Sequence, residues 1–284
     1  MSSNDYLKKV KNKIPRSIKP AIKYLYYLLF DTLDLLTLRN VKGLPPKRLN
    51  YEGNNGFKEE GEKYFKYFVE LVDVKKNSNI LEIGCGFGRM AMPFTKYLSN
   101  EGSYVGVDII NGGIKWCSKN ITQKYPNFYF SWLKDIFNTS YNPKGKIKAS
   151  EFKFLFPNDT FDFVILISVF THMLPEDIEN YISEITRILK PNSKCFATFY
   201  LINPQSEKLV KQRKTQYLFL ETEEGYYTTN PNSPEDAVAY KENFILDVIN
   251  RNNLKLSSEI KYGHWRKDNG EPSLQDIIVF EKLV

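Results

Sequence analysis

Histidine and cysteine are scarce in this sequence, which has two histidines and three cysteines among 284 residues. Cys85, Cys117 and Cys195 have neither metal-type nor disulfide-type spacing, so we expect a protein of a reducing compartment. No cluster of carboxylates and histidines has the spacing of metal ligands either. The sequence therefore predicts no metal and, for an enzyme, chemistry that does not depend on magnesium.

Long apolar runs are also missing. The first apolar stretch begins only at Ala21 and no small-residue cleavage site follows it, so no signal peptide is expected. Residues 22–38 have a helical period, but their internal charges and short length exclude a comfortable transmembrane helix. We expect a cytoplasmic protein.

Positive charge is concentrated at one end of the chain. Residues 1–30 contain seven basic residues and one acid, a surplus of six out of the total of +7. Because the remainder is nearly neutral, no nucleic-acid partner is expected. One face of the following helix carries apolar side chains and Thr32: Ile22, Leu25, Leu28, Leu29, Thr32 and Leu36. A basic arm before such a helix suits an anionic membrane surface. Packing on the main domain or on a second subunit is the alternative, which leaves a homo-oligomer open.

The most informative stretch is Ile80–Gly88, where an apolar run of β type ends at Glu82 and three glycines follow at alternate positions. Glycine allows a tight turn and lets a ligand approach the backbone closely. A dinucleotide loop has G-x-G-x-x-G spacing to seat a pyrophosphate at a helix N-terminus. The G-x-G-x-G spacing here, with a carboxylate two positions earlier, instead favours a ligand that carries ammonium and sulfonium charge.

Three later apolar runs also end in polar side chains. Within Tyr104–Ile109 the apolar run ends in Asp108, which in a βαβ unit would accept hydrogen bonds from two ribose hydroxyls. Within Phe128–Ile136 the next run ends in Asp135, for which capping of a loop is the alternative role. The continuous run from Phe161 is typical of a central strand and leads to Ser168 and His172.

These four segments resemble the motifs of the class I S-adenosylmethionine (SAM)-dependent methyltransferases. The resemblance implies an α/β, Rossmann-like fold with a mostly parallel seven-stranded sheet, an antiparallel last strand, helices on both faces and an N-terminal helical extension. It also implies SAM as cofactor and S-adenosylhomocysteine as its product. The residues that it assigns to the cofactor site are Glu82, Gly84, Cys85, Gly86, Gly88, Asp108, Ile109, Asp135, Ile136 and Ser168.

We expect two parts, because Gly43–Asn50 breaks the chain after the amphipathic helix. Residues 1–50 would form the basic arm and helix, and residues 51–284 the methyltransferase domain. Within this domain, Tyr51–Phe57 would cover the SAM site or form an ordinary linker. Residues 204–243 are too long for a simple connection and are expected to form an insertion on the substrate side.

The expected acceptor is a sugar, because tyrosines stand among carboxamides and carboxylates in residues 204–243. A lid in which the tyrosines only pack is the alternative. The ending of the chain, Gly-x-Trp, a polar loop, Gln-Asp and a strand, is similar to methyltransferases of bacterial and archaeal surface glycans. The residues expected to bind the acceptor are Tyr226, Tyr227, Tyr240, Trp265 and Arg266.

An acceptor hydroxyl must lose a proton, and histidine is the natural base near neutral pH. His264 is our first choice and His172 our second, with a surface turn and a wall of the SAM site as their alternative roles. We therefore expect O-methylation of a sugar in a glycan or glycolipid precursor, by an enzyme peripheral to the inner face of the cell membrane. A protein or small-metabolite methyltransferase, an RNA methyltransferase and an inactive SAM-binding scaffold are the alternatives. Ser168-Val-Phe-Thr stands where enzymes that methylate nucleic-acid amino groups carry Asn/Asp-Pro-Pro-Tyr/Phe.

Overall fold

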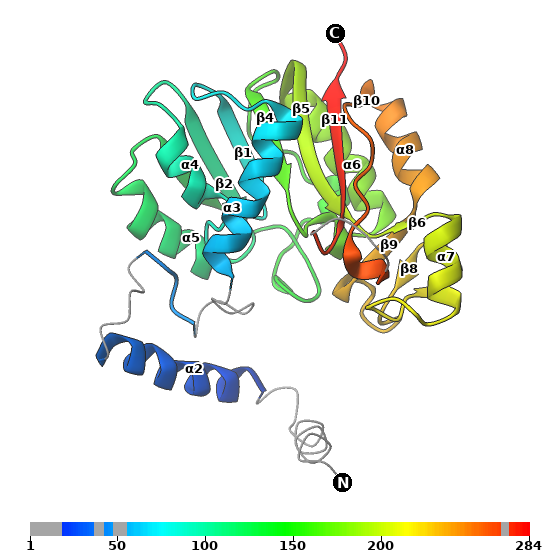
Figure 1. The fold of residues 1–284 in the computed structure, drawn as a ribbon, viewed down its shortest axis with the longest axis horizontal. Helices are drawn as coiled ribbons and strands as arrows, with labels where there is room; N and C mark the ends of the chain where they lie inside the picture. Colours follow the sequence, from blue (N-terminus) through cyan, green and yellow to red (C-terminus); the bar gives the residue numbers. More distant parts are fainter. Residues whose placement is uncertain (1–18, 37–42, 48–55, 268–272) are drawn as a thin grey trace. The chain divides into compact units, whose positions relative to one another are not determined.

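A computed structural model describes residues 19–36, 43–47, 56–267 and 273–284 (Figure 1). Packing divides the chain into two units, Met1–Glu59 and Glu60–Val284, which we describe separately. The expected basic arm in residues 1–18 and positions 51–55 of the expected cover lie outside the described residues.

The first unit contains one described long helix, α2 (Lys19–Leu36). The helical period of the sequence is thus confirmed here. The backbone N–H of Lys47 donates a hydrogen bond of 2.7 Å to Asp31 Oδ1, which ties the segment 43–47 to one side of α2. Among the described residues, no helix combines the length and the apolar character needed to cross a bilayer.

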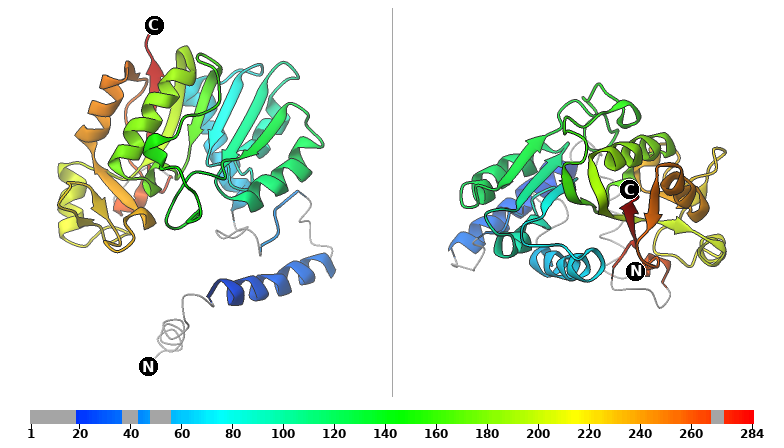
Figure 2. Two further views of the ribbon diagram at one scale, coloured as in Figure 1. Left: turned by 180° about the vertical axis from the view of Figure 1, so that it is seen from behind. Right: turned by 90° about the horizontal axis from the view of Figure 1, so that it is seen from above.

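The second unit is built on a seven-stranded sheet with the order β10-β11-β5-β4-β1-β2-β3 (Figures 1 and 2). The strands are β1 (Asn79–Ile83), β2 (Ser103–Asp108), β3 (Phe128–Trp132), β4 (Phe161–Leu166), β5 (Leu189–Phe199), β10 (Leu254–Leu256) and β11 (Asp276–Lys282). Neighbouring strands are parallel except that β11 runs antiparallel to both β5 and β10. The predicted sheet, including its antiparallel last strand, is confirmed.

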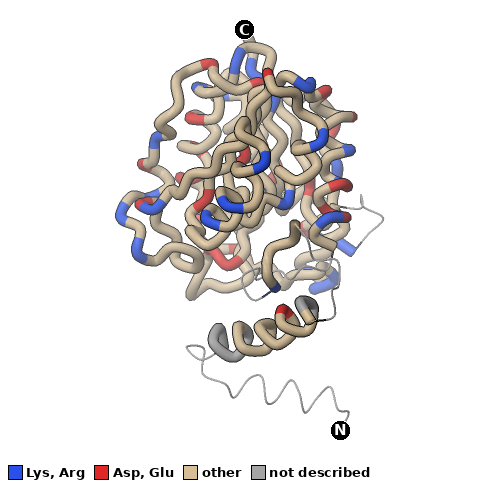
Figure 3. Tube along the Cα trace, turned by 90° about the vertical axis from the view of Figure 1, so that its left-hand side faces the viewer, with Lys and Arg blue, Asp and Glu red and all other residues tan. Residues whose placement is uncertain are grey.

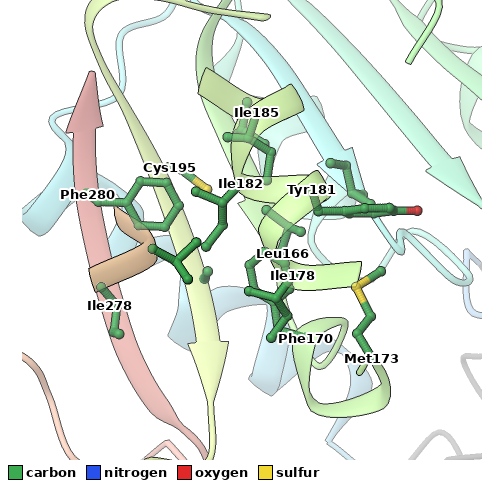
Figure 4. Packing of buried hydrophobic residues seen from close by; sticks show 14 of the residues in the cluster. Leu166, Phe170, Met173, Ile178, Tyr181, Ile182, Ile185, Cys195, Ile278 and Phe280 are labelled. Atoms are coloured by element: carbon green, nitrogen blue, oxygen red, sulfur yellow. The ribbon is translucent and has the colours of Figure 1, made fainter. Parts of the chain in front are cut away.

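Helices cover both faces of this sheet, as predicted. Successive side chains of a strand point to opposite faces, so each strand contributes to two cores. Ile80 belongs to a core with Phe68 and Phe94, whereas Leu81 and Ile83 belong to the core on the other face, part of which Figure 4 shows. The first core involves α3 (Phe57–Tyr67), the π-helical turn at Phe68–Val72, α4 (Ala91–Tyr97) and α5 (Asn111–Cys117). The second involves α6 (Pro175–Ile188) and α8 (Glu242–Arg251).

The insertion forms a small second sheet of four short strands with the order β6-β9-β8-β7. They are β6 (Leu201–Ile202), β7 (Leu220–Glu221), β8 (Tyr227–Thr228) and β9 (Val238–Lys241), accompanied by α7 (Pro204–Lys211). Since β6 begins two residues after β5 ends, this sheet grows directly from the carboxyl end of a central strand (Figure 1). The insertion is therefore placed at the edge where the predicted site residues gather.

Candidate functional site

The site lies where the chain leaves β1 and β4, two adjacent parallel strands. The helix that follows β1, α4, packs on one face of the sheet, whereas the helix that follows β4, α6, packs on the other. Connections that diverge in this way leave a crevice at the carboxyl ends of the strands, which is where open α/β sheets bind ligands. Four of the predicted segments end at this edge.

The glycine loop after β1 has the left-handed backbone that its spacing predicts. Gly84, Gly86 and Gly88 have φ angles of 78°, 50° and 73°. A side chain at Gly84 would meet Val169 Cγ2 at 2.4 Å, and one at Gly88 would meet Ile121 Cδ1 at 2.8 Å. These two glycines are therefore required by packing against the rest of the domain.

Gly86 differs from its neighbours, because a Cβ built on it meets no atom within 4 Å. Its backbone N–H donates a 2.6 Å hydrogen bond to Asp108 Oδ2. Its carbonyl lies against Gly113 at the start of α5, where a Cβ would approach Gly86 O to 2.1 Å. Gly86 is thus fixed from two sides and presents its remaining side to open space, as a cradle for a ligand requires.

Asp108 links this loop to the end of β2. Its Oδ1 accepts a 2.6 Å hydrogen bond from the N–H of Ile110, and its Oδ2 accepts the bond from Gly86. Burial raises the pKa of the Asp108 carboxyl, and the backbone N–H groups of Ile110, Gly86 and Ile109 oppose that shift. A carboxylate has about four lone-pair sites, so these donors still leave acceptor capacity for a hydroxyl group.

Glu82 is not open to a ligand in the way that the sequence suggested. Its side chain is 3% exposed, and its carboxylate accepts a short hydrogen bond from the Tyr104 hydroxyl on β2. Burial raises the pKa of Glu82 to about 8, although the bond from Tyr104 acts in the opposite direction. Glu82 lies on the same face of β1 as Ile80, which α3, α4 and α5 cover, and this burial makes it an internal support of the glycine loop.

Four further residues assigned to the cofactor site differ in how exposed their side chains are. Cys85 and Ile136 are buried at 3% and 2% exposure, and burial raises the pKa of the Cys85 thiol. Ile109 is half-buried, and its carbonyl accepts a hydrogen bond from Trp132 Nε1. Asp135 is exposed, and its carbonyl accepts hydrogen bonds from the N–H groups of the loop at 146–147. Only Asp135 offers an accessible polar side chain.

Ser168 lies in a polar network that the sequence did not predict. Its φ is 58°, its N–H donates to Thr198 Oγ1 and its Oγ donates to Gln275 Oε1. Thr198 Oγ1 donates to the same Gln275 oxygen at 2.6 Å. The Gln-Asp pair before the last strand was the available signal, although it was read there only as a resemblance to glycan enzymes.

His172 ends the 3₁₀ turn Phe170–His172 that follows β4. Its Nδ1 lies 2.9 Å from the carbonyl oxygen of Glu235, in the insertion. A carbonyl oxygen can only accept, so Nδ1 carries the proton and neutral His172 presents Nε2 as its acceptor nitrogen. Burial lowers the pKa of His172, and Tyr141 packs edge-on against its ring at a centroid distance of 5.2 Å.

His264, Trp265 and Arg266 form a 3₁₀ turn beside the start of β11. His264 is exposed, and its N–H donates to the carbonyl of Ser273. Trp265 is fully buried and donates its indole N–H to Asp276 Oδ2. Arg266 is 4% exposed and lies over the Tyr262 ring, 4.5 Å from its centroid. The burial of Trp265 and Arg266 corrects the expectation that they face an acceptor.

The tyrosines of the insertion also differ from one another. Tyr240 is fully buried, and its hydroxyl lies within hydrogen-bonding reach of the carbonyls of Phe170 and Met173. Tyr227 is 2% exposed in the core of the small sheet, whereas Tyr226 is half-buried. Tyr227 and Tyr240 thus pack the insertion down, which was the alternative role, and of these three tyrosines only Tyr226 keeps surface for an acceptor.

Potential metal ligands, surface charge and a polar groove elsewhere on the domain also bear on the site. No group of three or more histidine, cysteine or carboxylate side chains within the described ranges is arranged to hold a metal ion. Basic and acidic positions are interspersed over the side of residues 60–284 that Figure 3 shows. A shallow polar groove of Asp73, Lys75, Asp162 and Lys190 lies at the opposite, amino-terminal edge of the sheet, away from the glycine loop.

Comparison with known proteins finds similarity to methyltransferases. A family model described as a methyltransferase domain matches residues 81–197. A tRNA N(3)-cytidine methyltransferase of Gallus gallus is 27% identical over 120 residues, which are 39% of this chain and 27% of that protein. The probable methyltransferase ltbC of Aspergillus luteorubrus is 31% identical over 126 residues, which are 42% of this chain and 38% of that protein. The chain thus matches well under half the length of either relative.

Among solved structures, magnesium protoporphyrin IX methyltransferase from Synechocystis PCC 6803, with bound S-adenosylhomocysteine, has a TM-score of 0.51 at 14% identity. The similarity covers 91% of this chain and 98% of that chain. At this identity the likeness concerns the fold.

Proposed function

We propose that this chain transfers a methyl group from SAM to an acceptor as a class I SAM-dependent methyltransferase, because residues 81–197 match a family model described as a methyltransferase domain. The observation that carries the proposal is the open side of Gly86 next to the Asp108 carboxylate. This pairing combines a backbone surface without a side chain and an acceptor for hydroxyl groups. A nucleoside with a ribose and a charged tail needs both.

Asp108 and Asp135 would hold the cofactor beside the open side of Gly86. Asp108 would accept hydrogen bonds from the ribose hydroxyls with the lone pairs that Gly86 and Ile110 leave unused. Asp135, exposed after β3, would accept a hydrogen bond from the adenine amino group. SAM would supply a methyl group on a sulfonium centre, which would pass to the acceptor oxygen with S-adenosylhomocysteine as the leaving group.

His172 is the base that this geometry favours. Its lowered pKa keeps the ring neutral at pH 7, and the Glu235 carbonyl holds the proton on Nδ1. Nε2 would then take the proton of an acceptor hydroxyl as the oxygen attacks the methyl carbon. His264, exposed at the same sheet edge, is the second candidate, although no comparable contact fixes the tautomer of its ring in the described residues.

We propose a sugar hydroxyl of a glycan or glycolipid precursor as the acceptor. Half-buried Tyr226, together with exposed Tyr141 beside His172, provides aromatic surface on which a sugar face can stack. Asn230 and Asp236 lie nearby in the insertion and offer polar groups for sugar hydroxyls. Proton transfer to a histidine needs no metal, so we propose a metal-independent O-methyltransferase.

Two measurements test the proposal separately. Calorimetric titration should show that SAM and S-adenosylhomocysteine bind with about micromolar affinity, equivalent to about 8 kcal/mol, and that NADH does not bind. Methyl transfer should then be followed with nucleotide sugars and glycolipids, and with tRNA, proteins and small metabolites as competing acceptors, with and without a chelator. Transfer only to a non-sugar acceptor would contradict the sugar assignment and leave the transferase assignment intact.

A further inference from the structure

Helix α2 displays a continuous apolar face that is largely exposed within the part of the chain that the structure describes. Six large apolar side chains on it are between 38% and 79% exposed: Leu25, Tyr26, Leu29, Phe30, Leu33 and Leu36. At about 100° per residue, these six fall within an arc of about 140°. We call them the α2 apolar face. Exposed apolar surface of this kind marks a binding surface for another molecule or a membrane.

The polar side of α2 is engaged by the chain itself. Asp31 lies opposite the α2 apolar face and accepts the hydrogen bond from the Lys47 N–H. The segment 43–47 therefore returns along the polar side, and Lys47 Nζ reaches only the edge of the apolar face, 5.9 Å from the Phe30 ring centroid. Asp31 is the one charged residue between positions 24 and 33 (Figure 3).

The charge of the sequence before the α2 apolar face indicates which kind of surface it binds. Residues 1–30 carry seven basic residues and one acid, and the six-charge surplus directly precedes the α2 apolar face in the chain. Basic residues near an anionic bilayer contribute about 1 kcal/mol each, and apolar side chains of an interfacial helix enter the boundary between headgroups and acyl chains. A second copy of the chain would bring two such basic segments together, which like-charge repulsion opposes.

We propose that α2 is an interfacial anchor that lies in the surface of an anionic phospholipid membrane. Its leucines and Phe30 enter the acyl boundary, Tyr26 lies at headgroup level, and the basic segment before it contacts anionic headgroups. Membrane binding by the anchor does not depend on methyl transfer. Its benefit, a site held next to membrane-bound acceptors, rests on the proposed function.

Vesicle binding by the full-length chain tests the anchor. Vesicles of phosphatidylcholine with phosphatidylglycerol should bind at least about tenfold more tightly than vesicles of phosphatidylcholine alone, and raised salt should reduce that difference. Leu29→Gln and Leu33→Gln should each weaken binding to anionic vesicles by about tenfold, because each removes one leucine that the membrane would bury. Tyr24→Gln is the matched control, since Tyr24 is 43% exposed but lies outside the α2 apolar face.

Three results would overturn the proposal. The first is equal binding to neutral and anionic vesicles, or binding to neither. The second is a dimer in analytical ultracentrifugation that Leu29→Gln dissociates and Tyr24→Gln does not, since a second copy would then cover the face. The third is a lowered melting temperature of Leu29→Gln relative to Tyr24→Gln in the absence of lipid, which would mean that the face packs on residues 60–284.

Discussion

Replacement of Gly86 by alanine tests the cofactor cradle most directly. Gly86 has a φ of 50°, and a Cβ at this position meets no protein atom within 4 Å. The left-handed backbone costs an alanine about 1 kcal/mol, so the variant should fold with a slightly lower melting temperature. Its methyl group would occupy the open side of the loop. The loss of one backbone contact of about 1–2 kcal/mol would weaken SAM binding by about 5- to 30-fold.

Gly225→Ala separates this effect from backbone strain. Gly225, in the turn between β7 and β8, has a φ of 85° and likewise no atom within 4 Å of a built Cβ. Both variants should lose similar stability in thermal unfolding, whereas calorimetric titration with SAM and S-adenosylhomocysteine should detect weaker binding only in Gly86→Ala. Affinities of Gly86→Ala within twofold of the unsubstituted protein would refute the assignment of the cradle.

Four other substitutions probe the remaining groups. Asp108→Asn should weaken SAM binding by about 1.5–3 kcal/mol in calorimetry, because a charged acceptor is lost, and unchanged affinity would exclude the ribose contact. His172→Gln should lower turnover by about 10²–10⁴ at unchanged SAM affinity, and His264→Gln far less. Burial lowers the pKa of His172 below 6.5, so this base stays neutral above that pH, and the turnover of the unsubstituted protein should fall only in more acidic buffer. A turnover that does not change down to pH 5 would argue against this base. Burial raises the pKa of Glu82 from 4.5 to about 8, so its contribution to stability is full below pH 4.5 and falls as the pH rises to about 8. Glu82→Gln should remove that decline and raise the free energy of unfolding at pH 8 by at least about 1 kcal/mol, and an unaltered pH profile would contradict it.

The sequence was sufficient for the sheet and for bringing the glycine loop next to Asp108, because both depend on local patterns. Buried strands read as continuous apolar runs, and the glycines at 84, 86 and 88 specify a turn whose left-handed backbone few other residues adopt. The carboxyl ends of parallel strands share an edge, so Asp108 and Ser168 had to lie near that turn.

What the sequence could not supply were contacts between distant segments. Gln275 bonds Ser168 across 107 positions, and no local pattern specifies such a pair. Whether Glu82 faces a ligand or Tyr104 depends on the register in which β1 pairs with β2. The tyrosines of the insertion were misjudged for a related reason. A tyrosine presents an apolar body and a polar hydroxyl, so composition alone does not distinguish Tyr240, which packs, from Tyr226, which stays accessible.

The bond between His172 Nδ1 and the Glu235 carbonyl has a consequence for how the proposed methyltransferase can diversify. The proposed base takes its orientation from the backbone of the acceptor-side insertion, and the Tyr240 hydroxyl bonds the turn that carries the base. An insertion exchanged for another to accept a new substrate would remove the group that sets the proton on the imidazole. Acceptor preference and proton removal are therefore inherited together, and grafted insertions should succeed only where a carbonyl returns to the position of Glu235 O.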